Sequence, residues 1–467
     1  MPVGESKGRA EIYATVKAEW FRLFTSKEIG EALEKLAGKE ASLDPGEQAL
    51  VQRTRSIYQR SKAIPPDLFR TFNEAKSKAY SVWVEAKEKS DFKIFQPALE
   101  EIIGFVRKFA ELYGYDKNPY DALLPDYEPG MTAENLKGII KPLREKLVPF
   151  VSLLRKQSDQ PDETILQGHF PEELQTKLSL EALRVIRYDF NQGRLDTTVH
   201  PFTISIGPDD TRVTTHFLPD KLAPALFATL HEGGHAIYDQ GIHPTMKWVY
   251  LDSGYSHGLH ESQSRMFENM VGRSLSFWKF FYPRLQGIFP YYKNIQLKDF
   301  HRAVNTVKPS LIRIYADEVT YNLHIMLRFE IEEALLKGEI EARDLPGLWN
   351  TKMQEYLGIL PENDAKGVLQ DVHWSSGYVG YFPTYMLGNL YAAQLFVAAK
   401  KEMRELEEEI TKGNFKNLLA WLRAKVHSFG YVREAPELLR EVTGDGPSSE
   451  PWLKYIKDKF GKIYGIS

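Results

Sequence analysis

The sequence predicts a mainly α-helical protein with one small antiparallel β-sheet, and two observations lead to this fold class. Apolar residues recur at helical spacing from residue 8 to about residue 186, and again from residue 222 to the end of the 467-residue chain. Between these parts, Arg187 to Phe217 alternates polar and apolar residues around turn signals at 191–193 and 207–210, as antiparallel strands do. With 43% hydrophobic residues, the chain can bury a large core.

The N-terminal part is expected to consist of helices of mixed charge that pack as antiparallel hairpins. Breaks are predicted at 42–45 and at 64–66, where turn residues and prolines interrupt the helical pattern. The stretch from Lys117 to Gly130 is rich in Pro, Asp and Tyr and is interpreted as a connector. Helices then resume to about Ile186.

The helix with the strongest functional signal is expected from Leu222 to Gly241. Pro224 suits its first turn, and a glycine can end it. The apolar stripe of this helix consists of Leu226, Leu230 and Ile237. Two consecutive glycines, Gly233 and Gly234, each cost about 1 kcal/mol against alanine inside a helix. We therefore expect another backbone, of the substrate or of the preceding strand, to approach the helix very closely there.

This helix contains the pentapeptide HEGGH, in which His231 and His235 lie four residues apart and therefore share one face. Two imidazoles so placed can bind one metal ion, and Glu232 can reach a water molecule on that ion. This is the arrangement of a zinc peptidase, in which the carboxylate takes a proton from the water. The alternative is a pair of core histidines beside a loose turn, which does not explain the spacing of the polar residues.

A catalytic zinc takes three protein ligands, so a third ligand is expected on another element. The next amphipathic helix opens with HESQSR, and its Glu261 is the predicted third ligand. His257 and His260 are the alternatives. A surface glutamate near the start of a helix, where its charge suits the helix dipole, is the non-functional interpretation of Glu261.

Composition excludes several classes of function. The formal net charge of -3, from 60 basic and 63 acidic residues, gives no reason to expect nucleic acid or an anionic membrane as a partner. The absence of cysteine excludes disulfides and thiolate ligands, so any metal must be held by histidine and carboxylate. Because the N-terminus lacks a secretory signal, a cytoplasmic protein is expected. The uncharged stretch from Trp374 to Ala399 is interpreted as a buried helix and loop.

Six motifs in one order along the chain resemble those of the M32 family of metallocarboxypeptidases, the thermostable Taq-type carboxypeptidases. These motifs are His200-Pro201-Phe202, Asp210-x-Arg212-x-Thr214, HEGGH, HESQ, Ile312-Arg313-x-x-Ala316-Asp317 and Gly367-x-x-Gln370-Asp371-x-His373-Trp374. An ordered set is far more specific than any one motif. The resemblance covers about residues 20 to 465.

The resemblance implies an almost all-helical fold with a deep active-site groove, similar to neurolysin and angiotensin-converting enzyme, in a single peptidase domain over residues 1–467. Residues 1–130 would form an N-terminal helical lid region and residues 131–467 the metal-binding catalytic region. Family members usually begin with a further helical segment, whereas this chain starts near the turn that follows it, at Met1-Pro2. The lid is therefore expected to lack those helices.

The resemblance also implies an activity and partners. The protein would remove single amino acids from peptides with a free C-terminus. It would use one divalent metal ion per chain, Zn²⁺ in the first place or Co²⁺, and would form a homodimer.

A carboxypeptidase must recognise a free carboxylate, and a fixed guanidinium does so with two parallel hydrogen bonds. Arg313 is the first candidate and Arg212 the second. Asp317 lies four residues after Arg313, so an intrahelical salt bridge is the alternative there. Arg212 lies on a predicted strand and could instead stabilise the sheet. His200 is expected to line the groove, with an edge strand as the alternative.

Peptide hydrolysis passes through an oxyanion, which a tyrosine hydroxyl or a neutral histidine can stabilise by several kcal/mol. The spacing of a histidine and two later tyrosines is similar to that of neurolysin-like peptidases and implies Tyr385 in this role, with Tyr378 and His373 as further candidates. An aromatic core is the alternative, and Tyr381 and Tyr391 are expected to belong to it.

The sequence therefore predicts a metallocarboxypeptidase in which His231, His235 and Glu261 hold the metal. Glu232 would deprotonate the water and later protonate the leaving amine. Two other classes remain open. An oligopeptidase that cuts internal bonds would share the metal site. A catalytically silent helical binding protein would bind its ligand without hydrolysing it.

Overall fold

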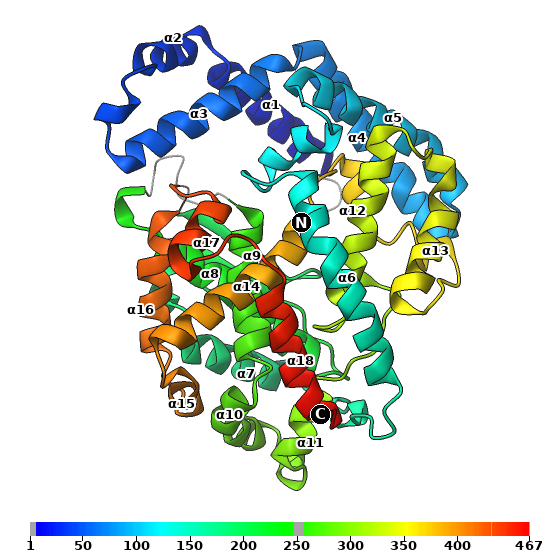
Figure 1. Ribbon diagram of the computed structural model, residues 1–467, viewed down its shortest axis with the longest axis vertical. Coiled ribbons are helices and arrows are strands. Elements are labelled where there is room, and N and C mark those ends of the chain that lie inside the picture. The colour runs from blue at the N-terminus through cyan, green and yellow to red at the C-terminus, as the bar shows by residue number, and fades with distance from the viewer. Residues whose placement is uncertain (1–5, 247–255, 431, 467) are drawn as a thin grey trace.

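The structure is a computed structural model that describes residues 6–246, 256–430 and 432–466. Over these residues it is mainly helical with one three-stranded sheet, so the predicted fold class is confirmed (Figure 1). None of the described helices is long and apolar enough to cross a membrane. The uncharged stretch from Trp374 onward forms a short turn and then a buried helix, as expected.

The N-terminal helices lie together at one end of the long axis (Figure 1). They are α1 (Ser6–Phe24), α2 (Lys27–Leu36), α3 (Pro45–Ala63), α4 (Pro66–Lys89) and α5 (Phe92–Tyr113). The predicted breaks are confirmed, because Asp44 starts α3 with a capping box to Glu47 and Pro66 starts α4. The predicted connector forms two short 3-10 turns, η3 (Pro119–Ala122) and η4 (Leu124–Asp126).

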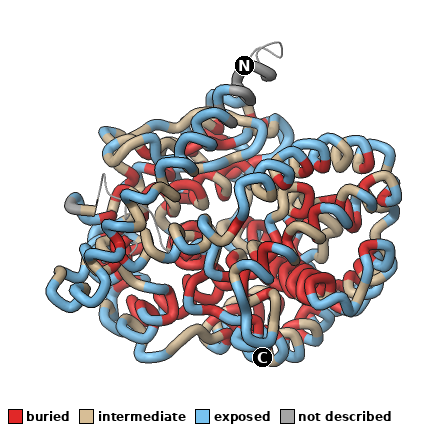
Figure 2. The backbone as a smooth tube through the Cα atoms, turned by 90° about the horizontal axis from the view of Figure 1, so that it is seen from above, coloured by how far each residue is buried: buried red, intermediate tan, exposed pale blue. Residues whose placement is uncertain are grey.

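The remaining helices include a long buried helix. They are α6 (Ala133–Arg155), α7 (Glu172–Val185), α8 (Ala223–Gly241), α9 (His257–Arg265), α10 (Leu275–Ile288), α11 (Leu297–Ala303), α12 (Tyr321–Lys337), α13 (Leu345–Leu357), α14 (Pro383–Glu402), α15 (Leu406–Thr411), α16 (Lys416–Lys425), α17 (Ala435–Thr443) and α18 (Glu450–Tyr464). The buried helix is α14, which packs against α9, α12, α17 and α18. One cluster of buried apolar side chains extends from Ile64 to Tyr464, and Figure 2 shows these buried segments inside an exposed outer layer.

The sheet lies between α7 and α8 in the chain and packs against α8. Its strands are β1 (Leu195–Thr197), β2 (Thr203–Gly207) and β3 (Asp210–Thr215), in the order β1-β3-β2. β2 and β3 form the predicted antiparallel hairpin around 207–210. The prediction is wrong for β1, which pairs with β3 in parallel. The chain reverses after β1, and the hairpin then places β3 between β1 and β2. Alternation of polar and apolar residues identifies strands but not their neighbours.

One buried carboxylate lies beneath the turn that follows Trp374. Glu332 of α12 accepts hydrogen bonds from the Trp374 indole at 2.8 Å, the Tyr120 hydroxyl at 2.8 Å and the Gly380 main-chain nitrogen at 3.1 Å. Burial raises the pKa of Glu332 to about 7, although these three donors act in the opposite direction. The protonated carboxyl is therefore favoured in the folded protein over a range in which the unfolded chain is ionised.

Glu332→Gln is expected to flatten the pH dependence of stability. Below a pKa of 4.5, the ordinary value, Glu332 is protonated in both states and contributes no pH dependence. Between this value and about 7, only the unfolded chain releases the proton, so the unfolding free energy of the wild type falls as pH rises, by about 3 kcal/mol from this group. Urea unfolding at the two ends of this window measures the difference.

The exposed Glu339→Gln is the matched control and should keep the wild-type pH dependence. An equal loss of stability with rising pH in Glu332→Gln and in the wild type would contradict the assignment.

Candidate metal centre

Three predicted side chains converge between α8 and α9. Nε2 of His231 lies 3.5 Å from Oε2 of Glu261, and Nε2 of His235 lies 3.2 Å from the same oxygen. The three ligand atoms all lie within 4.8 Å of one another. In a tetrahedral zinc site with bonds of about 2.0–2.2 Å, neighbouring ligand atoms are about 3.3 Å apart. The donor set and its spacing therefore fit one divalent metal ion.

The second ring nitrogen of each histidine, Nδ1, already has a hydrogen-bond partner. Nδ1 of His231 lies 2.9 Å from Oε2 of Glu268, and Nδ1 of His235 lies 2.6 Å from Nδ1 of His260. Nε2 of His260 lies 2.9 Å from Oδ1 of Asp239. If Asp239 accepts the Nε2 proton of His260, then Nδ1 of His260 accepts from His235 and leaves the inner nitrogen of His235 free for a metal.

His260 is therefore placed as a partner of a histidine and not in the cluster of three, a geometry that favours Glu261 as the third ligand. His257 lies apart as well, because its Nδ1 is 3.1 Å from the main-chain oxygen of Tyr127. Burial lowers the pKa of His235, and the nearby His260 lowers it further. A neutral imidazole, as a metal ligand requires, is favoured at this position.

Glu261 is buried, so the interpretation as a surface glutamate is wrong. Its Oε1 accepts a hydrogen bond of 2.7 Å from Nε of Arg265, which also donates from Nη1 to Glu268 at 3.1 Å. Burial alone would raise the pKa of Glu261, but Arg265 and His231 hold it well below its ordinary value. Glu261 is thus held as a carboxylate, the form that binds a cation.

Local structure at both ends of α9 explains the placement of Glu261. The Ser256 hydroxyl accepts from the Leu259 nitrogen as the helix cap and donates to the buried Glu128 at 2.6 Å. The Gly258 nitrogen also donates to Glu128, at 2.9 Å. Beyond Arg265 the helix widens into the π-helix Met266–Val271, whose Glu268 reaches His231.

The predicted base is oriented by the sheet. Glu232 is buried, and the hydroxyl of Thr203 on β2 lies 2.8 Å from both its Oε2 and its main-chain oxygen. Thr203 was not predicted as a site residue. Its signal in the sequence is its position directly after His200-Pro201-Phe202, in the predicted hairpin that precedes the metal helix.

The glycine pair in α8 marks a close approach of two helices. A Cβ at Gly234 would lie 2.5 Å from the main-chain oxygen of Gln263 and 2.7 Å from Cα of Ser264. The expected close backbone is confirmed, but it belongs to α9 and not to the substrate or the preceding strand. Gly233 instead faces the side chains of Leu183 in α7 and of Ile186 just after it. The absence of a side chain at Gly234 allows α9 to bring Glu261 toward the two histidines.

Gly388 of α14 makes a similar space for the ligand itself, since a Cβ there would lie 2.3 Å from Cγ of Glu261. Gly388→Ala is expected to displace Glu261 and to weaken zinc affinity by about 10- to 100-fold, the usual effect of disturbing the support of a ligand. Competition with a chromogenic chelator measures this affinity.

Gly138→Ala is the matched control, because a Cβ at this helical position in α6 meets nothing within 4 Å. The control should bind zinc as the wild type does. Equal zinc affinity in Gly388→Ala and Gly138→Ala would show that Glu261 is not held by this packing.

A second cluster of charged groups surrounds Arg313 on the 3-10 turn η10 (Arg313–Tyr315). Its Nε and Nη2 donate to Oδ1 of Asp371 at 3.1 and 2.9 Å, and its Nη1 donates to the Tyr321 hydroxyl at 2.9 Å. The carboxylate of Asp317 accepts hydrogen bonds from the main-chain nitrogen of Lys308 and from that of the residue just before α12. The alternative salt bridge between Arg313 and Asp317 does not form. The ring of Tyr321 lies 4.3 Å from the Arg265 guanidinium, which joins this cluster to the metal centre.

Two of the three predicted oxyanion groups, Tyr385 and His373, lie beside Arg313. The Tyr385 hydroxyl is 3.3 Å from Nε2 of His373, and the Arg313 guanidinium lies 4.7 Å from the centre of the Tyr385 ring. Burial lowers the pKa of His373 to about 4, so this imidazole is neutral near pH 7. Tyr378 is 50% exposed, whereas Tyr391 is buried in the core as expected.

The structure does not join the two other predicted residues to this site. Arg212 forms a bidentate ion pair with Asp210 on its own strand, in which Nε donates to Oδ1 at 2.9 Å and Nη2 donates to Oδ2 at 2.7 Å. His200 is exposed, and its Nδ1 lies 2.8 Å from the main-chain oxygen of Pro201. Within the described parts of the chain, neither side chain forms a hydrogen bond or ion pair with the metal cluster or Arg313.

Several supporting residues were missed by sequence reasoning. They are Thr203, Asp239, Glu268 and Tyr321. Helical spacing could have indicated two of them, because Asp239 follows His235 by one helical turn and Glu268 follows Glu261 by two. Tyr321 has no such signal, since Arg313 lies outside its helix and Arg265 comes from a distant segment.

The chain resembles known proteins over its full length. Residues 1–460 match the sequence model of the family described as Carboxypeptidase Taq (M32) metallopeptidase. The chain is 43% identical to "Thermostable carboxypeptidase 1" of Thermus thermophilus, with 98% of this chain and 92% of that protein covered. It is 40% identical to "Carboxypeptidase 1" of Bacillus subtilis, with 99% and 93% covered.

The fold is similar as well. The crystal structure of the M32 carboxypeptidase from Deinococcus radiodurans superimposes with a TM-score of 0.96 at 34% identity, covering 100% of this chain and 94% of that one. Family, relatives and fold agree with the convergence of two histidines and a glutamate on one ligand position. The chain belongs to the M32 family of metallocarboxypeptidases.

Proposed function

We propose that this protein removes single amino acids from the C-termini of peptides by metal-dependent hydrolysis. One observation supports this function most directly: Tyr321 links the cluster of two histidines and a glutamate to a buried arginine. Its hydroxyl accepts a hydrogen bond from Arg313, and its ring lies 4.3 Å from the guanidinium of Arg265, which donates to the predicted ligand Glu261. A metal site alone would suit any metallopeptidase. A fixed guanidinium beside it supplies recognition of a terminal carboxylate.

We assign the metal to His231, His235 and Glu261. Nitrogen and carboxylate donors at this spacing suit Zn²⁺ in the first place and Co²⁺ as the alternative. When bound, the ion would polarise the peptide carbonyl and make a water molecule more acidic. The pairs formed by His231 with Glu268 and by His235 with His260 hold both imidazoles in the orientation that the ion requires.

Glu232 is assigned the proton transfers. Its carboxylate accepts a proton from the attacking water, whose oxygen forms a bond to the peptide carbonyl carbon. Glu232 then donates this proton to the leaving nitrogen as the C–N bond breaks, so that a carboxylic acid and an amine are released. Thr203 keeps the carboxylate in one orientation through its hydrogen bond to Oε2.

Arg313 is assigned to the substrate carboxylate. A guanidinium has five N–H groups, and Asp371 and Tyr321 use three of those on Arg313. One N–H on each terminal nitrogen remains for the two oxygens of a carboxylate. Arg212 remains the second candidate, although its pairing with Asp210 favours a role in the sheet.

Tyr385 is assigned to the oxyanion, with His373 and Tyr378 as further candidates. The neutral His373 lies within reach of the Tyr385 hydroxyl and can orient it. Lining of the groove by His200 stays a prediction, as does the groove itself.

The larger organisation is proposed from the sequence. A single domain is supported by the one apolar cluster from Ile64 to Tyr464, with residues 1–130 as lid and 131–467 as catalytic region. A homodimer and a cytoplasmic location stay predictions. Light scattering on the purified protein tests the dimer.

Mass spectrometry of digested peptides tests the function. We expect losses of one C-terminal residue at a time that stop with a chelator and return with added zinc or cobalt. The same peptide with an amidated C-terminus is the control and should resist cleavage. Equal cleavage of both peptides at internal bonds would instead favour an oligopeptidase.

A further inference from the structure

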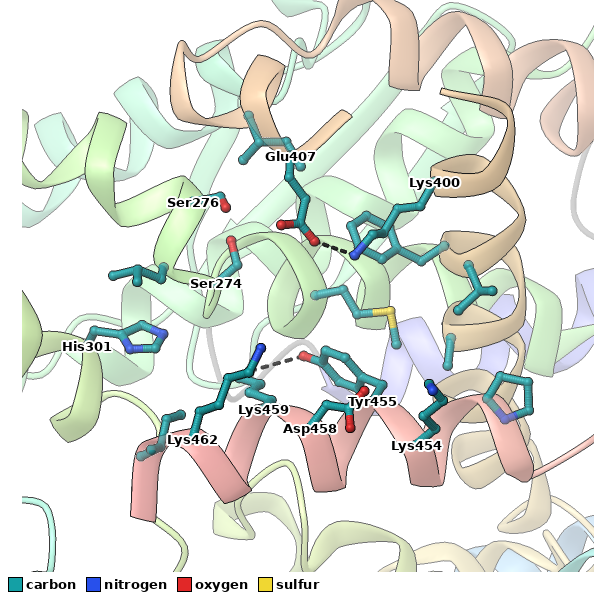
Figure 3. A pocket seen from close by; sticks show the side chains of 18 of the residues that line it. Ser274, Ser276, His301, Lys400, Glu407, Lys454, Tyr455, Asp458, Lys459 and Lys462 are labelled. Carbon is teal, nitrogen blue, oxygen red and sulfur yellow. Dashed lines mark hydrogen bonds and ion pairs between the residues drawn. The ribbon is translucent and has the colours of Figure 1, made fainter. Parts of the chain in front are cut away.

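A cavity of about 1170 Å³ opens between α10, α11, α14, α15 and α18 (Figure 3). None of the proposed metal ligands or substrate-binding residues lines it. Its volume lies slightly above the usual range for small-molecule sites, about 300–1,000 Å³. The peptidase activity assigns no role to this cavity.

The cavity has an apolar wall that is open to solvent. Leu275 at the start of α10 is 41% exposed, and Val397 on α14 is 50% exposed. Phe396 and Ile410 continue this surface into the interior, where both side chains are buried. An apolar chain placed against this wall would remove exposed hydrocarbon from water.

The charged groups around the apolar wall are predominantly basic: seven Lys and Arg side chains line the cavity, against three Asp and Glu. Some of these charges are already neutralised, for example Lys400 by Glu407 and the buried Lys459 by Glu318. Four lysines form no ion pair with any described residue, namely Lys279, Lys298, Lys454 and Lys462. Figure 3 shows Lys454, Lys459 and Lys462 along α18, which forms one side of the cavity.

An apolar wall with unpaired cations at its edge is suited to one class of ligand. We propose that this cavity binds an amphiphilic anion, an apolar chain with a carboxylate or phosphate head group, which the four unpaired lysines would hold at the cavity edge. The apolar chain of the ligand covers Leu275 and Val397, and its head group faces the lysines. This binding site is separate from the peptide site.

A second copy of the protein fits this surface less well. In a two-fold dimer the same surface meets itself, so clustered lysines would approach one another. Glu407 pairs with Lys400 and Glu450 pairs with Lys146, which leaves Asp458 as the carboxylate of the cavity without an ion pair to a described residue. One carboxylate is too few to balance four lysines.

Isothermal titration of the full-length protein with decanoate, decyl phosphate, decanol and decyltrimethylammonium tests the site. Both anions should bind, and the neutral and cationic compounds should bind about tenfold more weakly or worse, because they lack a charge that the lysines attract. The tighter of the two anions identifies the head group. Equal binding of decanol and the anions, or no anion binding, overturns the proposal.

Charge reversal locates the binding. Lys454→Glu combined with Lys462→Glu should weaken decanoate binding by about tenfold or more. Lys457→Glu is the matched control, because Lys457 is exposed on the same helix and does not line the cavity. All variants should keep peptide hydrolysis, which shows that they are folded.

Two results with these variants would overturn the proposal. One is decanoate binding by the double variant that is as tight as binding by Lys457→Glu. The other is a changed oligomeric state of the double variant in light scattering with unchanged decanoate binding, which would make this surface an interface between copies of the chain.

Discussion

Replacing Glu232 with glutamine is expected to lower kcat for peptide cleavage by about 10³-fold, within the range by which general acid–base catalysis accelerates reactions. Glutamine has nearly the same shape and can still accept the hydrogen bond from Thr203, which lies 2.8 Å from Oε2. It has no basic oxygen that could take the proton of the attacking water. Kinetics with a free peptide and zinc content by mass spectrometry give the two readouts.

Zinc content separates loss of the base from loss of the metal. The Glu232→Gln variant should retain one zinc per chain, because His231, His235 and Glu261 are unchanged. Glu261→Gln is the comparison variant and should lose both activity and zinc, because the charge that Arg265 and the histidines hold on this carboxylate is removed. Full activity of Glu232→Gln would exclude this residue as the base.

Local geometry explains why much of the metal centre could be predicted. Residues four apart on a helix share a face, so His231 and His235 follow from the helix alone. Gly234 indicated that a backbone passes closely, because a glycine inside a helix is unfavourable without such a reason. The pattern did not show which backbone passes, since α9 is brought there by tertiary packing.

The support of the site depends on contacts between distant segments, which periodicity does not report. Thr203 reaches Glu232 from a strand, and Asp371 reaches Arg313 across more than 50 positions of the chain. The alternative salt bridge to Asp317 was reasonable for a helix, but Arg313 lies on a 3-10 turn where this spacing does not bring side chains together. The parallel pairing of β1 was missed for the same reason, because it depends on the path between strands.

Arg313→Met is expected to lower kcat/KM for peptides with a free C-terminus by about 10²- to 10³-fold, corresponding to about 3–4 kcal/mol for a lost buried charge-assisted contact. Arg328 should keep the fold intact, because it still donates to Oδ2 of Asp371 at 2.7 Å from Nε. Burial alone would raise the pKa of Asp371, but Arg313 and Arg328 hold it well below its ordinary value. Cleavage of amidated peptides, already slow, should change little, so the ratio between free and amidated peptides reports carboxylate recognition directly.

Two further variants test whether recognition of the substrate carboxylate needs the forked guanidinium or only a positive charge, and whether Arg212 is the residue that binds it. Arg313→Lys keeps a positive charge but loses the forked donor pair, so its kcat/KM should lie between that of the wild type and that of Arg313→Met. Arg212→Met is the control for the second candidate and should stay within about threefold of the wild type, because a partly exposed ion pair contributes little. If Arg212→Met removes the preference for a free C-terminus and Arg313→Met retains it, the carboxylate binds at the sheet and Arg313 serves only to neutralise Asp371. The geometry favours Arg313, since its guanidinium contacts Tyr321, whose ring lies against the arginine that holds Glu261.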